Sequence, residues 1–213
     1  MRNISKLDRV LMEVDNVMRT LFIPEQRCSQ RVYPAASLND ASMTQREKKH
    51  VAGLMRVNHA GEVCAQALYQ GQALTAQLTN IRDQMAHAAA EEIDHLAWCE
   101  QRLRELDSHP SILNPCWYLG SFMIGLIAGS AGDRWSLGFV AETERQVTAH
   151  LANHVQRLPR QDKKTRVVLE SMHEDEAQHA KLAEQSGAAS LPYLVKKIMS
   201  CISNVMTKSS YYV

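Results

Sequence analysis

The sequence is poor in glycine, proline and aromatic residues. Only 9 of its 213 residues are glycine and 6 are proline, and aromatic side chains make up 6%. Sandwiches and barrels need aromatic strands and turns rich in glycine and proline, so this composition argues against an all-β fold. The 10 methionines and the many alanines favour helices instead. The hydrophobic share of 45% and the charged share of 22% are those of an ordinary globular protein.

An excess of charge of either sign is also missing. The 24 lysines and arginines are balanced by 23 acidic residues, which leaves a formal net charge of +1. Proteins that bind nucleic acids usually carry a strong basic excess, so we expect no nucleic-acid partner. The first residues contain no continuous apolar stretch followed by a cleavage site, and we therefore expect no secretory signal.

Paired cysteines are absent as well. The five cysteines are far apart in the sequence and none lies in a C-x-x-C pair, which argues against a disulfide framework, a zinc ribbon and a rubredoxin-type iron site. Free cysteines of this kind are typical of a reducing compartment. The five are Cys28, Cys64, Cys99, Cys116 and Cys201.

The spacing of apolar residues predicts six or seven helices and no strand. We divide the chain into an N-terminal amphipathic helix and loop, residues 1–43, and a helical bundle domain, residues 44–213. The N-terminal helix is expected over residues 4–22. Thr44 and Glu47 have the form of a capping box, which predicts that the next helix begins there. Further helices are expected over residues 80–106, 116–130, 133–158 with Asp133 as N-cap, 162–185, and in a short segment after Pro192.

Four of the predicted helices carry one glutamate inside an apolar stripe. An ionised carboxylate is costly to bury unless it is paired or binds a cation, so four such residues need a shared explanation. The first and second glutamates lie 30 residues apart, the third and fourth 32, and a histidine follows each second glutamate by three positions. Residues three apart share a helix face, so the chain contains two copies of one helical hairpin. The residues concerned are Glu62, Glu92, His95, Glu144, Glu176 and His179.

Two such hairpins predict an all-α fold, a ferritin-like antiparallel four-helix bundle with additional apolar and terminal helices. In this bundle four carboxylates and two imidazoles meet, and their charge balances two divalent cations. Oxygen and imidazole ligands suit iron or manganese better than metals that prefer thiolates. The rival interpretation is a structural bundle whose glutamates lie on a solvent-facing side, and it predicts no bound metal.

Residues near these six leave choices open. Glu142 competes with Glu144, but the apolar stripe favours Glu144. Tyr69, two turns after Glu62, either lines the pocket or is a core aromatic residue with a hydrogen-bonded hydroxyl. His150 either reaches the edge of the site or lies on the surface.

An acidic residue directly precedes each E-x-x-H sequence. A metal-bound histidine usually donates its other N–H group to a carboxylate. Our hypothesis is that Glu91 and Asp175 accept these hydrogen bonds, across the pseudo-twofold axis that relates the two repeats. The alternative, a solvated charge on the next helix face, fits the sequence equally well.

Residues 116–130 form the most apolar part of the chain. This stretch is too short to span a bilayer as a helix, which needs about 20 residues, and Asp133 and Arg134 close it. It is therefore either a buried core helix or an interfacial segment that lies in a membrane surface. An apolar segment of this length does not suit the shell-forming surface of an iron-storage cage.

Four sequence runs resemble the bacterial demethoxyubiquinone hydroxylases of ubiquinone biosynthesis. They are RVNHAGE at 56–62, EEIDH at 91–95, GLIAG at 125–129 and EDEAQH at 174–179, and the resemblance covers residues 45–213. It implies a di-iron monooxygenase whose metal ligands are the four glutamates and two histidines of the repeat. The enzyme would use O2 as co-substrate, two iron ions as cofactor and an external reductant that the sequence does not identify. Its reaction would hydroxylate the ring of 2-polyprenyl-3-methyl-6-methoxy-1,4-benzoquinol. The alternative is a ferritin-like iron-handling protein without hydroxylase activity.

The resemblance also implies peripheral attachment to the cytoplasmic side of the cell membrane, where a polyprenyl quinol resides. The apolar segment would then dock on lipid and admit the tail, whereas the competing interpretation is burial in a subunit interface. Other proteins of ubiquinone biosynthesis are candidate partners. No G-x-G-x-x-G sequence follows a strand, so we expect no Rossmann site for a nicotinamide. The predicted lipid-facing residues are Trp117, Tyr118, Phe122, Met123, Ile124, Leu126 and Ile127.

Overall fold

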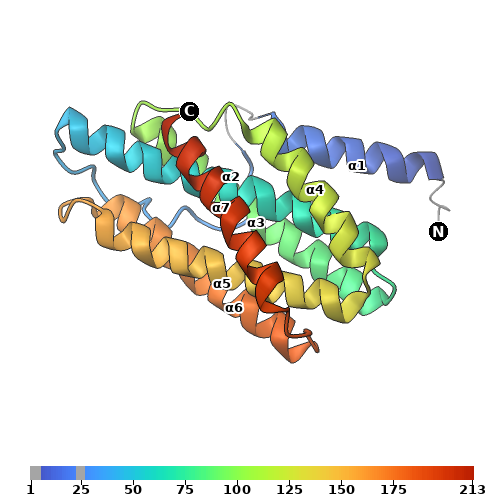
Figure 1. Ribbon diagram of the computed structural model, residues 1–213. Helices are drawn as coiled ribbons and strands as arrows, with labels where there is room; N and C mark the ends of the chain where they lie inside the picture. Colours follow the sequence, from blue (N-terminus) through green and yellow to red (C-terminus); the bar gives the residue numbers. More distant parts are fainter. Residues whose placement is uncertain (1–5, 23–26) are drawn as a thin grey trace.

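The computed structural model describes residues 6–22 and 27–213, and these residues form seven helices and no strand (Figure 1). The all-α fold is confirmed. Residues 4 and 5, which the sequence pattern places in the first helix, lie outside the described part. The last helix has 20 residues and is longer than predicted, because no glycine or proline interrupts it after Pro192. The helices are α1 (Lys6–Leu21), α2 (Gln45–Thr75), α3 (Thr79–Glu105), α4 (Asn114–Ser130), α5 (Asp133–Arg157), α6 (Lys163–Gln185) and α7 (Tyr193–Tyr212).

Two helix starts follow directly from local side-chain chemistry. The capping box before α2 is confirmed: the Thr44 hydroxyl accepts a hydrogen bond from the backbone N–H of Glu47, and the Glu47 carboxylate accepts one from the N–H of Thr44 at 2.8 Å. At α6, the Asp162 carboxylate accepts from the N–H of Thr165 at 3.1 Å. Each cap satisfies backbone donors that a helix leaves without an internal partner.

The start of α5 differs from the prediction. Gly132, with a φ of 106°, is the N-cap residue, and Asp133 is the first residue of the helix. Only glycine adopts this φ at little cost. The Asp133 carboxylate accepts hydrogen bonds from the backbone N–H groups of Gln77 and Leu78, at 3.0 and 2.8 Å. It therefore attaches the turn between α2 and α3 to the start of α5.

Helices α2, α3, α5 and α6 form an antiparallel bundle, in which α2 and α6 run one way and α3 and α5 the other (Figure 1). A single long connection between α3 and α5 contains α4, which packs across α2. One such crossover is typical of ferritin-like bundles. Glycines allow α2 and α4 to approach closely, since a Cβ atom on Gly125 would lie 2.4 Å from the carbonyl oxygen of Leu68.

The apolar core of the bundle divides into two clusters with a polar layer between them. On each of the four bundle helices, the predicted metal ligands lie between residues of one cluster and residues of the other. Burying a large apolar side chain contributes about 1.5–3 kcal/mol, whereas a buried polar layer costs free energy unless it is paired. The Leu169 cluster includes Leu54, Met55, Trp98, Leu103, Leu151, Leu158, Leu169 and Met172. The Met85 cluster includes Ala65, Tyr69, Ile81, Met85, Ala88, Leu137, Val140, Ala141 and Ala183.

Helices α1 and α4 lie together on the outside of the bundle (Figure 1). Val17 and Leu21 of α1 and Phe122 of α4 pack against one apolar cluster, which consists of Val63, Ala67, Leu96 and Tyr118. With 17 residues, α4 is shorter than the roughly 20 residues needed to span a bilayer. In the described ranges no helix is long and apolar enough to cross a membrane.

Candidate metal centre

The structure brings the six predicted ligand residues together in the polar layer. Each of the six residues is buried, with an exposed fraction of at most 8%. Their ligand atoms fall into two groups, and within each group the atoms lie within 4.8 Å of one another. Two glutamates belong to both groups, which is the arrangement needed to bridge two neighbouring metal ions. One group is Glu62, Glu92, His95 and Glu176, and the other is Glu92, Glu144, Glu176 and His179.

The electrostatics of this cluster fit a cation site. Burial, together with the charges of Glu176 and Glu62, raises the pKa of Glu92 well above its usual value, and burial together with Glu176 does the same for Glu144. Burial also opposes ionisation of Glu176, but hydrogen bonds with both histidines outweigh it and lower the pKa of this carboxyl. Among the described residues, nothing donates a hydrogen bond to the buried oxygens Glu92 Oε1 and Glu144 Oε2. Buried carboxylate oxygens without donors, in a cluster of four carboxylates, fit the binding of two metal ions.

Both imidazole rings direct Nδ1 into the cluster. His95 Nδ1 is 3.0 Å from Glu176 and its Nε2 is 2.9 Å from Asp175. His179 Nδ1 is 3.2 Å from Glu176 and its Nε2 is 2.9 Å from Glu91. The acid that precedes each E-x-x-H sequence therefore contacts the histidine of the opposite repeat. Donation of Nε2–H to these acids leaves the Nδ1 lone pair available to a metal ion.

The three residues that sequence analysis left open lie in different surroundings. Tyr69 is buried and its hydroxyl donates a hydrogen bond to Glu144. Burial raises the pKa of Tyr69 well above its usual value, so the hydroxyl keeps its proton. Glu142 lies outside the ligand groups and forms an ion pair with Lys196 at 3.2 Å. His150 lies against α7, where its Nε2 is 3.2 Å from a serine hydroxyl.

The two ends of the centre have different surroundings. At one end, which we call the closed end, Asp175 forms an ion pair with Arg31 at 2.5 Å, and the Arg31 guanidinium lies 4.7 Å from the centre of the Trp98 ring. At the other end, which we call the open end, the Glu91 side chain is 39% exposed and lies 3.4 Å from His87, which is 76% exposed. Arginine and tryptophan therefore cover one histidine ligand, whereas the carboxylate beside the other faces solvent.

Sequence reasoning missed Arg31, Trp98 and His87. Arg31 lies in the segment before α2, where no periodic pattern indicates its partner. Trp98 follows a ligand histidine by three positions, and His87 precedes Glu91 by four. Both therefore share a helix face with a residue of the site, and helical spacing could have identified them.

The sequence run RVNHAGE on α2 builds a buried polar network beside the cluster. His59 Nε2 is 3.3 Å from Glu100 Oε1, and the same oxygen accepts a hydrogen bond from Arg27 at 2.7 Å. His154 Nδ1 donates to the side-chain oxygen of Asn58 at 2.8 Å. These contacts connect α2 to α3, to α5 and to the segment that precedes α2, so they position the helix that carries the first ligand.

Part of the predicted lipid-facing surface is buried. For Tyr118 the prediction is wrong, because this residue is 4% exposed, its hydroxyl donates to Gln70, and its ring stacks on that of Phe122. Phe122 and Leu126 are half-buried. Because α4 is apolar on every side, its sequence does not show which face packs on the protein. In the structure, the face that contains Tyr118 packs against α1 and α2.

The other predicted residues of α4 lie on two different surfaces. Met123 and Ile127 are 50% and 68% exposed. Trp117 and Ile124 line an apolar groove of about 390 Å³ between α2, α4, α5 and α7. An exposed apolar face and an apolar groove therefore lie side by side on one helix.

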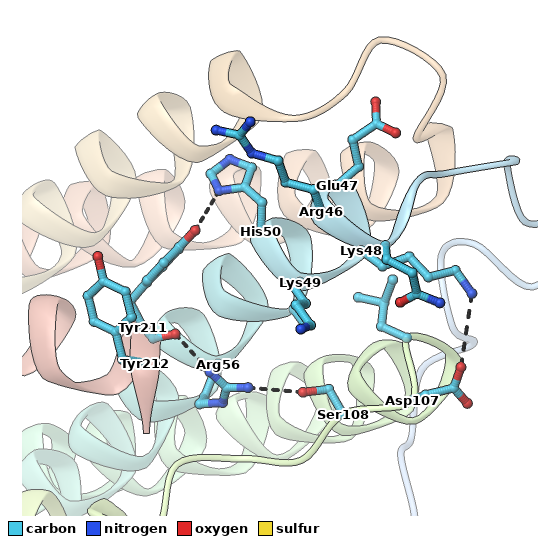
Figure 2. A pocket seen from close by; sticks show the side chains of 13 residues that line it. Arg46, Glu47, Lys48, Lys49, His50, Arg56, Asp107, Ser108, Tyr211 and Tyr212 are labelled. Carbon is cyan, nitrogen blue, oxygen red and sulfur yellow. Dashed lines mark hydrogen bonds and ion pairs between the residues drawn. The ribbon is translucent and has the colours of Figure 1, made fainter.

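A second, basic cavity of about 840 Å³ lies at the start of α2 and contains none of the ligand residues (Figure 2). In it, Arg56 donates hydrogen bonds to the Tyr211 carbonyl at 2.7 Å and to Ser108 Oγ at 3.0 Å. His50 Nδ1 lies 2.6 Å from the Tyr211 hydroxyl. A Cβ atom on Gly53 would lie 2.7 Å from the Tyr211 ring. These contacts attach the end of α7 to α2.

Comparison with known proteins assigns this bundle to a family. The family model described as "Ubiquinone biosynthesis protein COQ7" matches residues 49–210. A protein of Legionella pneumophila (strain Paris) named 3-demethoxyubiquinol 3-hydroxylase is 62% identical over 213 residues, which cover all of both chains. A protein of the same name from Acinetobacter baumannii (strain ACICU) is 54% identical over 212 residues, again with full coverage of both. The chain therefore belongs to the COQ7 family of ubiquinone biosynthesis proteins.

Proposed function

We propose that this chain is a di-iron hydroxylase that uses O2 to hydroxylate the ring of 2-polyprenyl-3-methyl-6-methoxy-1,4-benzoquinol. The observation that carries the proposal is the buried set of four carboxylates and two imidazoles, in which Glu92 and Glu176 belong to both ligand groups. The names of the two relatives, each a 3-demethoxyubiquinol 3-hydroxylase, support the reaction. Iron storage can use the same kind of bundle, but it predicts many irons per chain instead of two.

The metal site has the donors that iron prefers. Carboxylate oxygen and imidazole nitrogen suit iron or manganese, and the four carboxylates balance two divalent ions. Bound iron would supply the activation of O2, a chemistry that amino-acid side chains lack. The ligands would be Glu62 and His95 for one ion, Glu144 and His179 for the other, and Glu92 and Glu176 shared between them.

The other groups of the site hold these ligands in place and keep the site dry. Asp175 and Glu91 accept hydrogen bonds from the Nε2 atoms of the histidines, which fixes both ring orientations. Tyr69 donates to Glu144 and so orients this carboxylate. The two apolar clusters on either side of the polar layer exclude bulk water, which strengthens the electrostatic interactions inside.

The apolar groove is the place we assign to the polyprenyl tail. Its walls are mainly apolar side chains of four helices. Ala65 and Val147 line it, and they follow the ligands Glu62 and Glu144 by three positions on α2 and α5. A tail in the groove would therefore lie directly behind two of the metal ligands, within reach of the reacting ring.

The exposed face of α4 is the surface we assign to the membrane. Leu119, Met123 and Ile127 are 63%, 50% and 68% exposed and recur at helical spacing beside the groove. We expect the double substitution of Met123 and Ile127 by Ser to reduce co-sedimentation with anionic phospholipid vesicles several-fold. The matched control replaces Val32 and Leu78 by Ser, since these residues are 82% and 56% exposed but lie outside α4. Equal loss in both variants would contradict the assignment.

The hydroxylase proposal is tested by product analysis on the iron-loaded protein. The protein is reduced chemically without air, mixed with the benzoquinol substrate in detergent, and exposed to isotopically labelled O2. We expect two irons per chain and one labelled oxygen atom in the ring, detected by mass spectrometry. A protein with two irons that yields no labelled product would refute the proposed reaction.

A further inference from the structure

The two ends of the metal centre present opposite charge to an approaching cation. A cavity of about 470 Å³ at the closed end is lined by Arg27, Arg31 and Arg104. A cavity of about 270 Å³ at the open end reaches the ligand His179, and no lysine or arginine is among the described residues that line it. Arg27 and Arg31 are paired with Glu100 and Asp175, and Arg104 adds a positive charge that repels a divalent cation, whereas the solvent-facing carboxylate at the open end attracts one.

Three side chains at the open end form a path from solvent to the ligands. The exposed fraction of the side chain falls from 76% at His87 to 39% at Glu91 and 8% at His179. His87 Nδ1 is 3.4 Å from Glu91 Oε2, and the same oxygen is 2.9 Å from His179 Nε2. Both contacts use one carboxylate oxygen, which leaves Glu91 Oε1 for an arriving ion. At the closed end the corresponding carboxylate, Asp175, is paired with Arg31, and the positive charge of Arg31 repels an arriving cation.

The inner end of this path meets unpartnered ligand atoms. Tyr69 lines the open-end cavity and donates a hydrogen bond to Glu144. The second oxygen of that carboxylate, Glu144 Oε2, is buried and accepts no hydrogen bond from the described residues. A cation that passes the open-end cavity therefore arrives at an acceptor that lacks a donor.

We propose that His87 and Glu91 form a capture site for divalent iron and that the open-end cavity is the path by which the metal reaches the centre. The inference rests on the proposed metal centre and adds a route and two residues to it. An imidazole and a carboxylate one helical turn apart are suitable first ligands for a partly hydrated ferrous ion. His87 is not one of the six ligands, so it acts on the rate of metal transfer and not on the final binding.

The test measures metal exchange in the iron-loaded protein. The protein is incubated without air with an excess of isotopically enriched Fe²⁺, and replacement of bound iron is followed by mass spectrometry of the metal. We expect His87→Ala to slow exchange by about three- to tenfold and to leave two irons per chain. Gln84 also lines the cavity, and we expect Gln84→Lys to slow exchange further by placing a positive charge there. If His87 had only a structural role, His87→Ala would change the iron content of the protein. It would not change the rate of iron exchange while the content stays constant.

Two control variants are measured in the same experiment. His109→Ala removes an exposed histidine far from the cavity, and Arg104→Gln removes a charge from the closed end. Both should exchange at the wild-type rate. Unchanged exchange in His87→Ala and Gln84→Lys, or faster exchange in Arg104→Gln, would overturn the proposed path while leaving the metal centre intact. A wild-type protein without bound iron would instead overturn the metal centre and the path together.

Discussion

The closed and open ends of the centre carry the same kinds of ligand but differ in what surrounds them. Each end has a histidine held by an acid of the opposite repeat, Asp175 at the closed end and Glu91 at the open end. Arg31 covers the first acid, and it comes from the segment before α2, which has no counterpart in the repeat. The repeat therefore provides the ligand set, and the unrepeated segment makes the two ends unequal.

The apolar packing is also tighter at the closed end than at the open end. The Leu169 cluster, on the side of Trp98, contains many large side chains, whereas the Met85 cluster contains several alanines. Small side chains leave space, and the open-end cavity lies in that region, between Met85, Val140 and Ala183. Dense packing suits an end that holds its metal ion, and looser packing suits an end that exchanges it.

The largest expected effect comes from removing a carboxylate that both ends share. We expect Glu176→Ala to abolish binding of both irons, because both ligand groups lose a carboxylate at once. Glu62→Ala removes a ligand from one group only and should lower iron content less. Elemental analysis of the purified variants measures the difference. Equal iron content in the two variants would contradict the shared role of Glu176.

The next effect concerns stability at the end of the bundle that contains the Leu169 cluster. Burial, with smaller contributions from His150 and Arg157, lowers the pKa of His154 from 6.5 to about 4. Between pH 6.5 and 4, His154 is therefore protonated in the unfolded chain but not in the folded chain. Its contribution to the free energy of unfolding is complete above pH 6.5 and is lost as the pH falls to 4. The loss is about 3 kcal/mol of unfolding free energy. We expect His154→Gln to flatten the pH dependence of urea unfolding over this range, and an unchanged slope would contradict the assignment.

A smaller effect should separate the two acids that hold the histidines. Asp175→Asn removes a carboxylate that is 22% exposed and paired with Arg31, and we expect metal affinity to fall by about ten- to a hundredfold. Glu91→Gln removes one that is 39% exposed, where water can replace part of its role, and the loss should stay below about tenfold. Competition with a calibrated chelator measures both affinities. The reverse order of losses would mean that the closed end is not the tighter one.

The ligand set was predictable from sequence because a helix converts spacing into position. A glutamate in an apolar stripe, and a histidine three residues after its partner, identify a helix face without knowledge of any distant contact. The same reasoning placed Glu144 ahead of Glu142, and the structure puts Glu144 in the cluster. Caps at Thr44 and Asp162 were also predictable, since they depend on residues only three positions apart.

Features that depend on distant contacts were not predictable. Arg31 meets Asp175 across 144 positions, from a segment without periodic pattern. Asp133 caps no helix of its own but binds the backbone at Gln77 and Leu78, a contact decided by how α5 meets the turn after α2. Tyr118 was misplaced because α4 is apolar on every side, so composition does not show which face is buried.

Mössbauer spectroscopy of protein loaded with isotopically enriched iron tests the central claim most directly, because it counts the metal environments. We predict two irons per chain in equal amounts, coupled to each other through shared carboxylates. We also predict two distinguishable signals, since Arg31 and Trp98 surround one end and solvent-facing Glu91 lies at the other. A single iron, many irons, or two uncoupled irons would contradict the shared centre, and one signal from two equivalent irons would contradict the inequality of its ends.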